Sequence, residues 1–318
     1  MSGFIGTITL NPSIDQNLVV KNLVKDDANR ALRILSTPGG KGVNVSKVVR
    51  ELGGKTHAYA LVGGLPGDLL RTLAEKIGVL LSVITVRGNT RINTVITDLK
   101  DKSQTRVSAP GPVMKKSDIR KFERRLLSAR PKPFVWALGG SLPQRMDPRA
   151  YRDLILRLEK NGTPCVLDTD GDALKFGIEA APFMIKPNEF EMCRLTGKKM
   201  RALGDYEEAA KKLVRKGIQV VIVSLGARGA LFVTQKESFH VTTPKVAVKS
   251  KVGAGDSLIG GVCLGLLRKM PLREAARLGV AASTSSVMRE APRLCRRSDI
   301  PKLLPKITVR DLERRVML

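Results

Sequence analysis

Short apolar runs alternate with longer segments of helical periodicity along most of the chain. The run at 4–10 is continuously apolar and β-prone, and it ends at Asn11-Pro12, as a strand buried on both faces would. Further runs rich in valine and isoleucine predict strands at 56–62, 134–138, 165–167, 183–185 and 219–224. Apolar positions spaced by three and four residues predict helices at 45–52, 119–126, 205–216 and 272–288. This alternation predicts a doubly wound, mainly parallel α/β sheet.

Two segments do not follow this alternation. Strand-like runs occur at 18–20 and 31–34 in the first segment, and at 92–98 and 104–108 in the second, with no helix between either pair. The second segment reads as a hairpin around the polar turn 99–103. Extra strands inserted after core strands predict a small β layer over one edge of the sheet, which would serve as a lid or as an oligomer contact.

Size and composition favour a protein with a large core. A chain of 318 residues that is 42% hydrophobic is long enough for one large α/β domain or for two domains. It has no apolar run of about 18 residues or more and no signal-peptide pattern at its N-terminus, so we expect an intracellular, cytoplasmic protein without a membrane segment. The four cysteines lie in no metal-ligand or redox spacing, which predicts reduced, structural thiols.

The balance of charge is strongly basic. Lysine and arginine number 56 against 29 acidic residues, which gives a formal net charge of +27. Such an excess favours polyanions in general, including phosphorylated metabolites, nucleic acid and membrane surfaces. Because only 4% of the residues are aromatic, the chain offers little for stacking on bases, and we expect nucleic-acid contact to be nonspecific if it occurs.

The run KVGAGDSLIGG at 251–261 reads as a glycine-rich turn that opens directly into an apolar helix of small residues. Free backbone N–H groups and the positive end of the helix dipole make such a helix start an anion site. Asp256 lies within it, although a carboxylate competes with an anion for those donors. A kinase needs both features, namely donors that steady a transferring phosphoryl group and a base for the attacking hydroxyl. An N-cap aspartate on a buried helix is the structural alternative.

A second glycine cluster, TPGGKGVN at 37–44, also leads into a helix. Its glycines allow a ligand to approach the backbone, and Asn44 offers a donor and an acceptor that suit a sugar hydroxyl, although a tight turn explains the glycines equally well. Asp15 follows the first strand at the ligand-binding edge of the sheet and is suited to grip a diol; an Asx-turn is its alternative. Arg91 opens the predicted hairpin and is a candidate for binding a phosphate, with a solvated edge arginine as the competing interpretation.

Two more strand ends carry polar groups. In KPNEFE at 186–191 a strand stops at proline and a helix starts, so that Asn188 and Glu191 have the spacing of a capping box. The side-chain oxygens of Asn188 and Glu191 would also suit a Mg²⁺ ion that is held through water beside bound phosphates. The run SLGARG at 224–229 is a strand followed by a glycine turn that would face a nucleotide.

Taken together and in this order, these segments resemble the ribokinase-like carbohydrate kinase superfamily over nearly the whole chain. They are most similar to its phosphosugar branch, which comprises 1-phosphofructokinase, minor-type 6-phosphofructokinase and tagatose-6-phosphate kinase. The resemblance rests on six ordered motifs: TLNPSID at 9–15, PGGKGVNV at 38–45, TRIN at 90–93, GSLP at 140–143, KPN at 186–188 and VGAGDS at 252–257. It implies a single Rossmann-like α/β domain over 1–318, with a β lid formed by about 15–37 and 91–108 that makes a homodimer contact.

The resemblance also implies roles for residues within these motifs and for several outside them. The general base would be Asp256, with an anion hole made by the amides of Gly253, Ala254 and Gly255. The sugar would be bound by Asp15, Gly39, Gly40, Lys41 and Asn44, and the phosphate already on it by Arg91 with help from Ser141 and Arg30. ATP would be bound by Lys186, Asn188, Glu191, Ser224, Gly226 and Gly229, with Asn188 and Glu191 holding Mg²⁺ through water.

The implied reaction is the ATP-dependent phosphorylation of a ketohexose monophosphate at a primary hydroxyl, which gives a bisphosphate. Fructose 6-phosphate, fructose 1-phosphate and tagatose 6-phosphate all remain as acceptors, and a kinase of an unphosphorylated sugar or a nucleoside is the alternative enzyme. Lys251 departs from the small residue that is common in the family, which leaves potassium dependence open. A basic nucleic-acid-binding protein on this fold is the alternative of another class.

Overall fold

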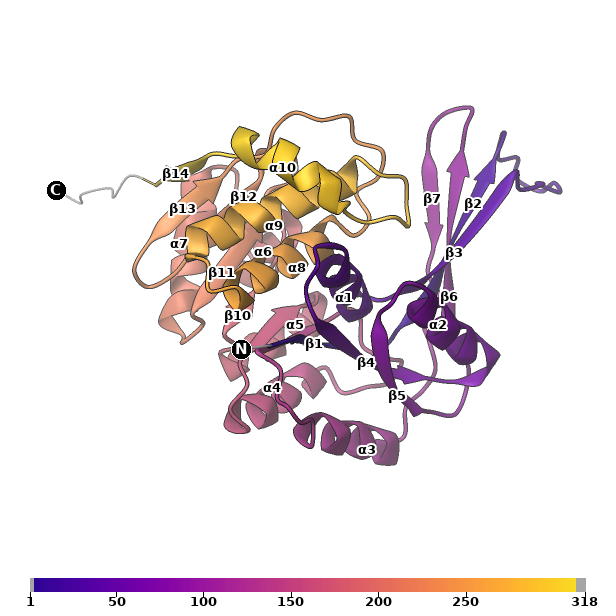
Figure 1. The fold of residues 1–318 in the computed structure, drawn as a ribbon, viewed down its shortest axis with the longest axis horizontal. Helices are drawn as coiled ribbons and strands as arrows, with labels where there is room; N and C mark the ends of the chain where they lie inside the picture. The colour runs from indigo at the N-terminus through magenta and orange to yellow at the C-terminus, as the bar shows by residue number, and fades with distance from the viewer. Residues whose placement is uncertain (1–2, 313–318) are drawn as a thin grey trace.

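The computed structural model describes residues 3–312. It contains one large sheet and a separate small sheet that projects from one side of it (Figure 1). The large sheet has the spatial order β14 (Val309–Asp311), β13 (Ser238–Val241), β12 (Ala230–Val233), β11 (Val220–Ser224), β10 (Met184–Ile185), β9 (Cys165–Asp168), β8 (Val135–Gly139), β1 (Ile5–Thr9), β4 (Thr56–Val62) and β5 (Leu80–Thr85). All neighbours from β11 to β5 are parallel, and β12 to β14 add an antiparallel edge. The predicted α/β fold class is confirmed.

Helices cover both faces of the large sheet. One face carries α1 (Lys41–Glu51), α8 (Ala254–Leu267), α9 (Leu272–Val287) and α10 (Ile300–Leu303). The other face carries α3 (Lys116–Leu127), α4 (Ala150–Lys160), α5 (Gly171–Gly177), α6 (Glu189–Thr196) and α7 (Leu203–Arg215). Helix α2 (Gly64–Lys76) packs over β4 near the small sheet. Within residues 3–312, no helix combines the length and the apolar character needed to cross a membrane.

The alternation of side chains along the central strands builds a core on each face of the sheet. On β8, Val135 and Ala137 belong to the core beneath α1, α8 and α9, whereas Trp136 and Leu138 belong to the core beneath α3 to α7. Successive side chains of a strand point to opposite faces, so a strand covered on both sides is apolar throughout. This explains why the central strands appear in the sequence as continuous apolar runs.

Close packing of α1 against α8 sets the position of the glycine-rich turn. At Gly260 a Cβ would lie 2.7 Å from Cγ1 of Val48, so only glycine lets the two helices approach this closely. The first turns of α1 and α8 consequently lie side by side at the carboxyl edge of the sheet, where open α/β sheets bind ligands.

The small sheet has the order β3 (Arg33–Gly39), β2 (Ser13–Val20), β6 (Arg91–Asp98) and β7 (Gln104–Val107). Both segments that broke the alternation contribute to it, and β6 and β7 form the predicted hairpin. The sheet contacts the larger part through Asn17, whose Nδ2 donates to the carbonyl of Ala291 at 2.7 Å, and through Ser250, whose Oγ lies 3.4 Å from Oε1 of Gln104.

Candidate active site

Asp256 lies buried in the first turn of α8, with 6% of its surface exposed. The helix begins after Gly253, which caps it with a φ of 77°, a conformation that favours glycine. Asp256 does not cap the helix; its Oδ2 instead accepts a hydrogen bond from Nδ2 of Asn44, on the adjacent α1, at 2.8 Å. The alternative of an N-cap aspartate is therefore wrong, and the carboxylate lies beside the N–H groups of Ala254 and Gly255 at the helix start.

Asp168, at the end of β9, is a site residue that the sequence motifs do not single out. Its Oδ1 accepts from Nζ of Lys41 at 3.0 Å and from Nζ of Lys186 at 3.3 Å. Its Oδ2 is buried and has no hydrogen-bond partner among the described residues. The signal that would have revealed it is its place at the carboxyl end of a buried strand, the edge of the sheet that also made Asp15 a candidate.

Burial and charge separate the pKa values of the two carboxylates. Burial and the neighbouring Asp168 raise the pKa of Asp256 to about 6, and Lys41, Asn44 and Lys186 only partly oppose this. For Asp168, burial is outweighed by the two lysines, so its pKa lies below the ordinary value. Burial alone would lower the pKa of Lys41, but Asp168, Asp256 and Glu191 raise it above its usual range. At neutral pH the centre therefore holds one firmly ionised carboxylate and a second that titrates near 6.

Asp15 lies within β2 and not in an Asx-turn, so that alternative is wrong. Its Oδ1 accepts from Oγ of Ser13 at 2.7 Å and from Nδ2 of Asn93 at 3.1 Å. At Gly39, which follows on the paired strand, a Cβ would lie 2.2 Å from Oδ2 of Asp15. A side chain on residue 39 would displace this carboxylate, and Gly40 then provides the positive φ of 106° that starts α1.

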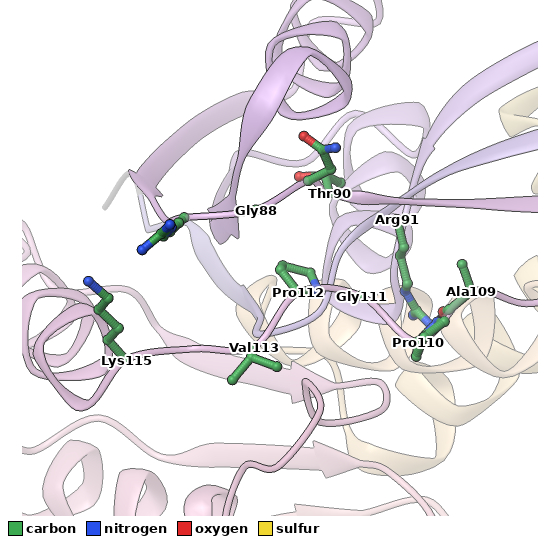
Figure 2. A pocket seen from close by; sticks show the side chains of 11 residues that line it. Gly88, Thr90, Arg91, Ala109, Pro110, Gly111, Pro112, Val113 and Lys115 are labelled. Carbon is green, nitrogen blue, oxygen red and sulfur yellow. The ribbon is translucent and has the colours of Figure 1, made fainter.

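Arg91 lines a cavity of about 620 Å³ (Figure 2). Its guanidinium donates to the carbonyls of Ala109 at 3.1 Å and Asn11 at 3.0 Å, while its Nε is buried and has no acceptor. Arg87 and Lys115 also line the cavity, and none of the described residues that line it is acidic. Lys115 lies at the opposite end of the cavity from Arg91 (Figure 2). A cavity with three cations and no carboxylate favours an anionic ligand.

The structure brings Ser141 to Arg91 but leaves Arg30 apart. Asn11 links the first two residues, because its side-chain Nδ2 donates to Oγ of Ser141 at 3.3 Å and its backbone carbonyl accepts from Arg91 at 3.0 Å. Arg30 is exposed in the turn between β2 and β3, at the end of the small sheet remote from Gly39, and it makes no hydrogen bond or ion pair with the other described residues. Arg30 therefore does not reach the Arg91 cavity of its own chain.

The residues predicted to bind ATP gather at the ends of β10 and β11. Asn188 caps α6, with Oδ1 accepting from N of Glu191 and its own N donating to Oε2 of Glu191, each at 2.8 Å. The expected capping box is present. Ser224 pairs with the same loop through N, which donates to the carbonyl of Pro187 at 3.0 Å. Two further predicted residues, Gly226 and Gly229, have positive φ values of 56° and 95° in the turn that follows β11.

Comparison with known proteins agrees with this geometry. The model of the pfkB family of carbohydrate kinases matches residues 5–299. The 1-phosphofructokinase of Bacillus subtilis (strain 168) is 32% identical over 308 residues, which are 97% of this chain and 100% of that protein. The ATP-dependent 6-phosphofructokinase isozyme 2 of Escherichia coli (strain K12) is 30% identical over 301 residues, which are 94% of this chain and 97% of that protein.

Solved structures give the same result. Phosphofructokinase-2 from Escherichia coli in complex with potassium superposes with a TM-score of 0.91 at 30% identity, over 96% of this chain and 99% of that one. Ribokinase from Thermotoga maritima, at 22% identity and a TM-score of 0.76, shares the fold. The family match spans nearly the whole chain and includes every strand end that contributes to the site. The protein therefore belongs to the pfkB family of carbohydrate kinases and is a sugar phosphotransferase.

Proposed function

We propose that the protein transfers the γ-phosphoryl group of ATP to the free primary hydroxyl of a ketohexose monophosphate. The observation that carries this proposal is Asp256, a buried carboxylate with a raised pKa beside the N-terminus of α8. The cationic cavity around Arg91 supports an acceptor that is already phosphorylated. The relatives named above are a 1-phosphofructokinase and a 6-phosphofructokinase, which favours fructose phosphates, with tagatose 6-phosphate as the third acceptor.

The chemical step is a direct in-line transfer without a covalent enzyme intermediate. Asp256 accepts the proton of the acceptor hydroxyl while the hydroxyl oxygen bonds to the γ-phosphorus. The bond from that phosphorus to the oxygen bridging to the β-phosphate breaks, and ADP leaves. The backbone N–H groups of Gly253, Ala254 and Gly255 would stabilise the charge on the transferring group. Closure of the small sheet over the site would exclude water as a competing acceptor.

Binding of the two substrates divides between the two ends of the site. On the sugar side we assign the hydroxyl groups to Asp15, Gly39, Gly40, Lys41 and Asn44, and the phosphate to Arg91 and Ser141. On the nucleotide side we assign the phosphates to Lys186 and the remaining contacts to Asn188, Glu191, Ser224, Gly226 and Gly229. Arg91 has five donors and uses two on backbone carbonyls, so it retains donors for a phosphate.

Magnesium would reach this site with the nucleotide. Among residues 3–312, no three His, Cys, Asp or Glu side chains lie close enough to hold a metal ion. This donor set fits an ion that keeps most of its waters and is held by ATP phosphates, with Glu191 bound through water and Asn188 holding the first turn of α6 in place. The ion would neutralise charge on the phosphates. We place the reaction in the cytoplasm, in keeping with four cysteines that are all free.

The pH dependence of turnover should show the pKa of the base. Because Asp256 must be ionised to accept a proton and its pKa is raised to about 6, kcat/KM should be level above pH 7 and fall about tenfold per pH unit below 6. Initial rates between pH 5 and 9, at constant ionic strength, measure this fall in kcat/KM at low pH, the acid limb of the profile. A limb near pH 4, the ordinary range of an aspartate, would contradict the role of a buried base.

Replacement of Arg91 tests the assignment of the acceptor. Arg91→Met should lower kcat/KM for the phosphosugar roughly 10- to 100-fold, mainly through KM, because a charge-assisted contact contributes about 1.5–3 kcal/mol. The rate with the parent unphosphorylated sugar and the KM for MgATP should change little. Arg106→Met, an exposed arginine on β7, is the matched control. An equal loss of kcat/KM with phosphorylated and unphosphorylated acceptors would show that Arg91 only holds the backbone carbonyls of Ala109 and Asn11 in place.

The small sheet is the surface through which we propose a homodimer. In the strand register, Ile34, Leu18 and Ile96 lie in one row, and Ile92 and Val107 share their face, opposite the face of Asp15. Three of these side chains are strongly exposed: Ile34 at 61%, Val107 at 58% and Ile92 at 40%. Exposed apolar side chains on one face of a projecting sheet are typical of a surface covered in an assembly.

Sedimentation velocity at micromolar concentration checks this assembly. The wild-type protein should sediment as a dimer, and the double variant Ile34→Asp, Val107→Asp should sediment as a monomer with an unchanged circular dichroism spectrum. In a dimer the turn that carries Arg30 would face a second copy, so the monomeric variant should also have a higher KM for the phosphosugar. A monomeric wild-type protein would refute the dimer and this role of Arg30 together.

A further inference from the structure

Lys47 is a mostly buried lysine on α1 that lies one turn after Asn44. Its Nζ donates to Oδ1 of Asn44 at 3.3 Å and to the carbonyl of Pro38 at 3.2 Å. It forms no ion pair with a carboxylate among the described residues, although a buried ammonium group is usually paired. Such a cation beside the active centre needs an explanation beyond packing.

The two hydrogen bonds of the Asn44 side chain determine which way its amide faces. Nδ2 donates to Oδ2 of Asp256, and Oδ1 accepts from Nζ of Lys47. An ammonium group only donates and an ionised carboxylate only accepts, so a flipped amide would set two donors against each other at Lys47 and two acceptors against each other at Asp256. Lys47 therefore specifies the orientation in which Asn44 donates to the carboxylate.

We propose that Lys47 is a positioning residue for the catalytic base, acting through Asn44 to direct an amide N–H onto Asp256 and so keep that carboxylate ionised and oriented. This proposal rests on the proposed function, in which Asp256 is the base. It adds a residue that belongs to α1, a different helix from that of Asp256, and that lies outside the glycine-rich motif at 251–261. The Lys47 side chain contacts the amide oxygen of Asn44, and the amide nitrogen of Asn44 contacts Asp256.

The charges around Lys47 agree with this role. Burial lowers its pKa to about 8, while Asp15 and Asp256 act in the opposite direction, so it is still mainly charged at neutral pH. The other charged groups acting on Asp256 are Asp168, which disfavours its ionised form, and Lys41 and Lys186, which favour it. Removing Lys47 takes away one favourable charge and releases Asn44, and both changes favour the protonated form of Asp256.

The experiment is the pH profile of kcat/KM for wild type, Lys47→Met, Lys47→Arg and Asn44→Leu, with the phosphosugar that the wild type uses. Lys47→Met should lower kcat/KM at pH 7.5 roughly tenfold and move the acid limb upward by half a pH unit or more. Asn44→Leu should move the limb in the same direction. Adding Lys47→Met to it should move the limb further by less than Lys47→Met moves it alone, because the part of the effect that acts through Asn44 is already lost and only the direct charge remains. Lys47→Arg, which keeps a charged donor, should restore most of the wild-type limb.

Controls separate this proposal from a purely structural role and from failure of the proposed function. Lys55→Met, at an exposed position on the connection after α1, should leave the profile unchanged. If Lys47→Met does not fold, Lys47→Gln keeps a polar side chain, one atom shorter and without the charge, and should shift the acid limb in the same upward direction. A folded Lys47 variant with an unmoved acid limb would show that Lys47 only anchors the turn at Pro38. A wild-type protein inactive on every phosphosugar would instead overturn the proposed function.

Discussion

Asp256→Asn should lower kcat by about 10³-fold with the best phosphosugar, because an amide cannot accept the proton of the attacking hydroxyl. The KM values for MgATP and sugar should change little, since the side chain keeps its shape and its oxygen can still accept from Asn44. ADP release in a coupled assay measures the loss. Asp26→Asn, an exposed aspartate in the turn after β2, is the matched control and should retain full activity.

The same variant should be more stable than the wild type. The pKa of Asp256 is raised from 3.8 to about 6 in the folded protein, so between these pH values the folded state binds more protons and stability falls as pH rises. Above pH 6 the ionised, buried carboxylate therefore costs about 3 kcal/mol of unfolding free energy. In urea denaturation at pH 7.5, the unfolding free energy of Asp256→Asn should exceed that of the wild type by this amount, and at pH 4 the two should be equal. A large loss of stability would mean that Asp256 is a structural residue.

Asp168→Asn should have the opposite effect on stability, although the two carboxylates lie in the same centre. Its side chain is the ion-pair partner of Lys41 and Lys186, and the Lys186 side chain is only 5% exposed. Because the pKa of Asp168 is lowered on folding, its ionised form stabilises the protein at neutral pH, and this stabilisation is lost as pH falls through that lowered pKa. Removing one partner of a buried ion pair typically costs about 3–5 kcal/mol.

The urea midpoint at pH 7.5 measures this cost, with Asp172→Asn on the exposed side of α5 as the control. Lys186 reaches the start of α8, because a Cβ at Gly255 would lie 3.0 Å from its Nζ. We also expect a higher KM for MgATP, because Lys186 would lose the contact with Asp168 that directs it there. A variant as stable as the wild type would show that the two lysines do not depend on Asp168 for their charge.

The central fold could be predicted because local pattern and tertiary environment agree there. Strands such as β1 and β8 are buried on both faces and therefore appear as continuous apolar runs. The apolar pattern did not predict β5, whose residues are mostly half-exposed, or the antiparallel strands β12 to β14 on the other side of the large sheet. Partial exposure weakens the apolar signal of β5, and β12 to β14 are only three or four residues long, so periodicity alone did not distinguish them from connections.

The candidate site was predictable where its residues are contiguous and not where only the fold assembles them. Asp256 stands within a glycine-rich helix start whose chemistry is visible in the sequence. Asp168 acquires its role from Lys41, which is 127 positions away in the chain, and the pairing exists only once β9 and α1 meet at the sheet edge. Arg30 is the converse case, since the family resemblance implies a phosphate ligand but the fold carries this residue to the end of the small sheet remote from Gly39.

The most direct test of the proposed reaction is a competition in one vessel. Wild-type protein is incubated with MgATP and equal concentrations of fructose 6-phosphate, fructose 1-phosphate, tagatose 6-phosphate, fructose, ribose and adenosine, and the early products are identified by mass spectrometry and chromatography. We expect a ketohexose bisphosphate as the main product, and about 10³-fold slower formation of it with Asp256→Asn. Phosphorylated fructose, ribose or adenosine as the main product would contradict a phosphosugar acceptor and the assignment of Arg91.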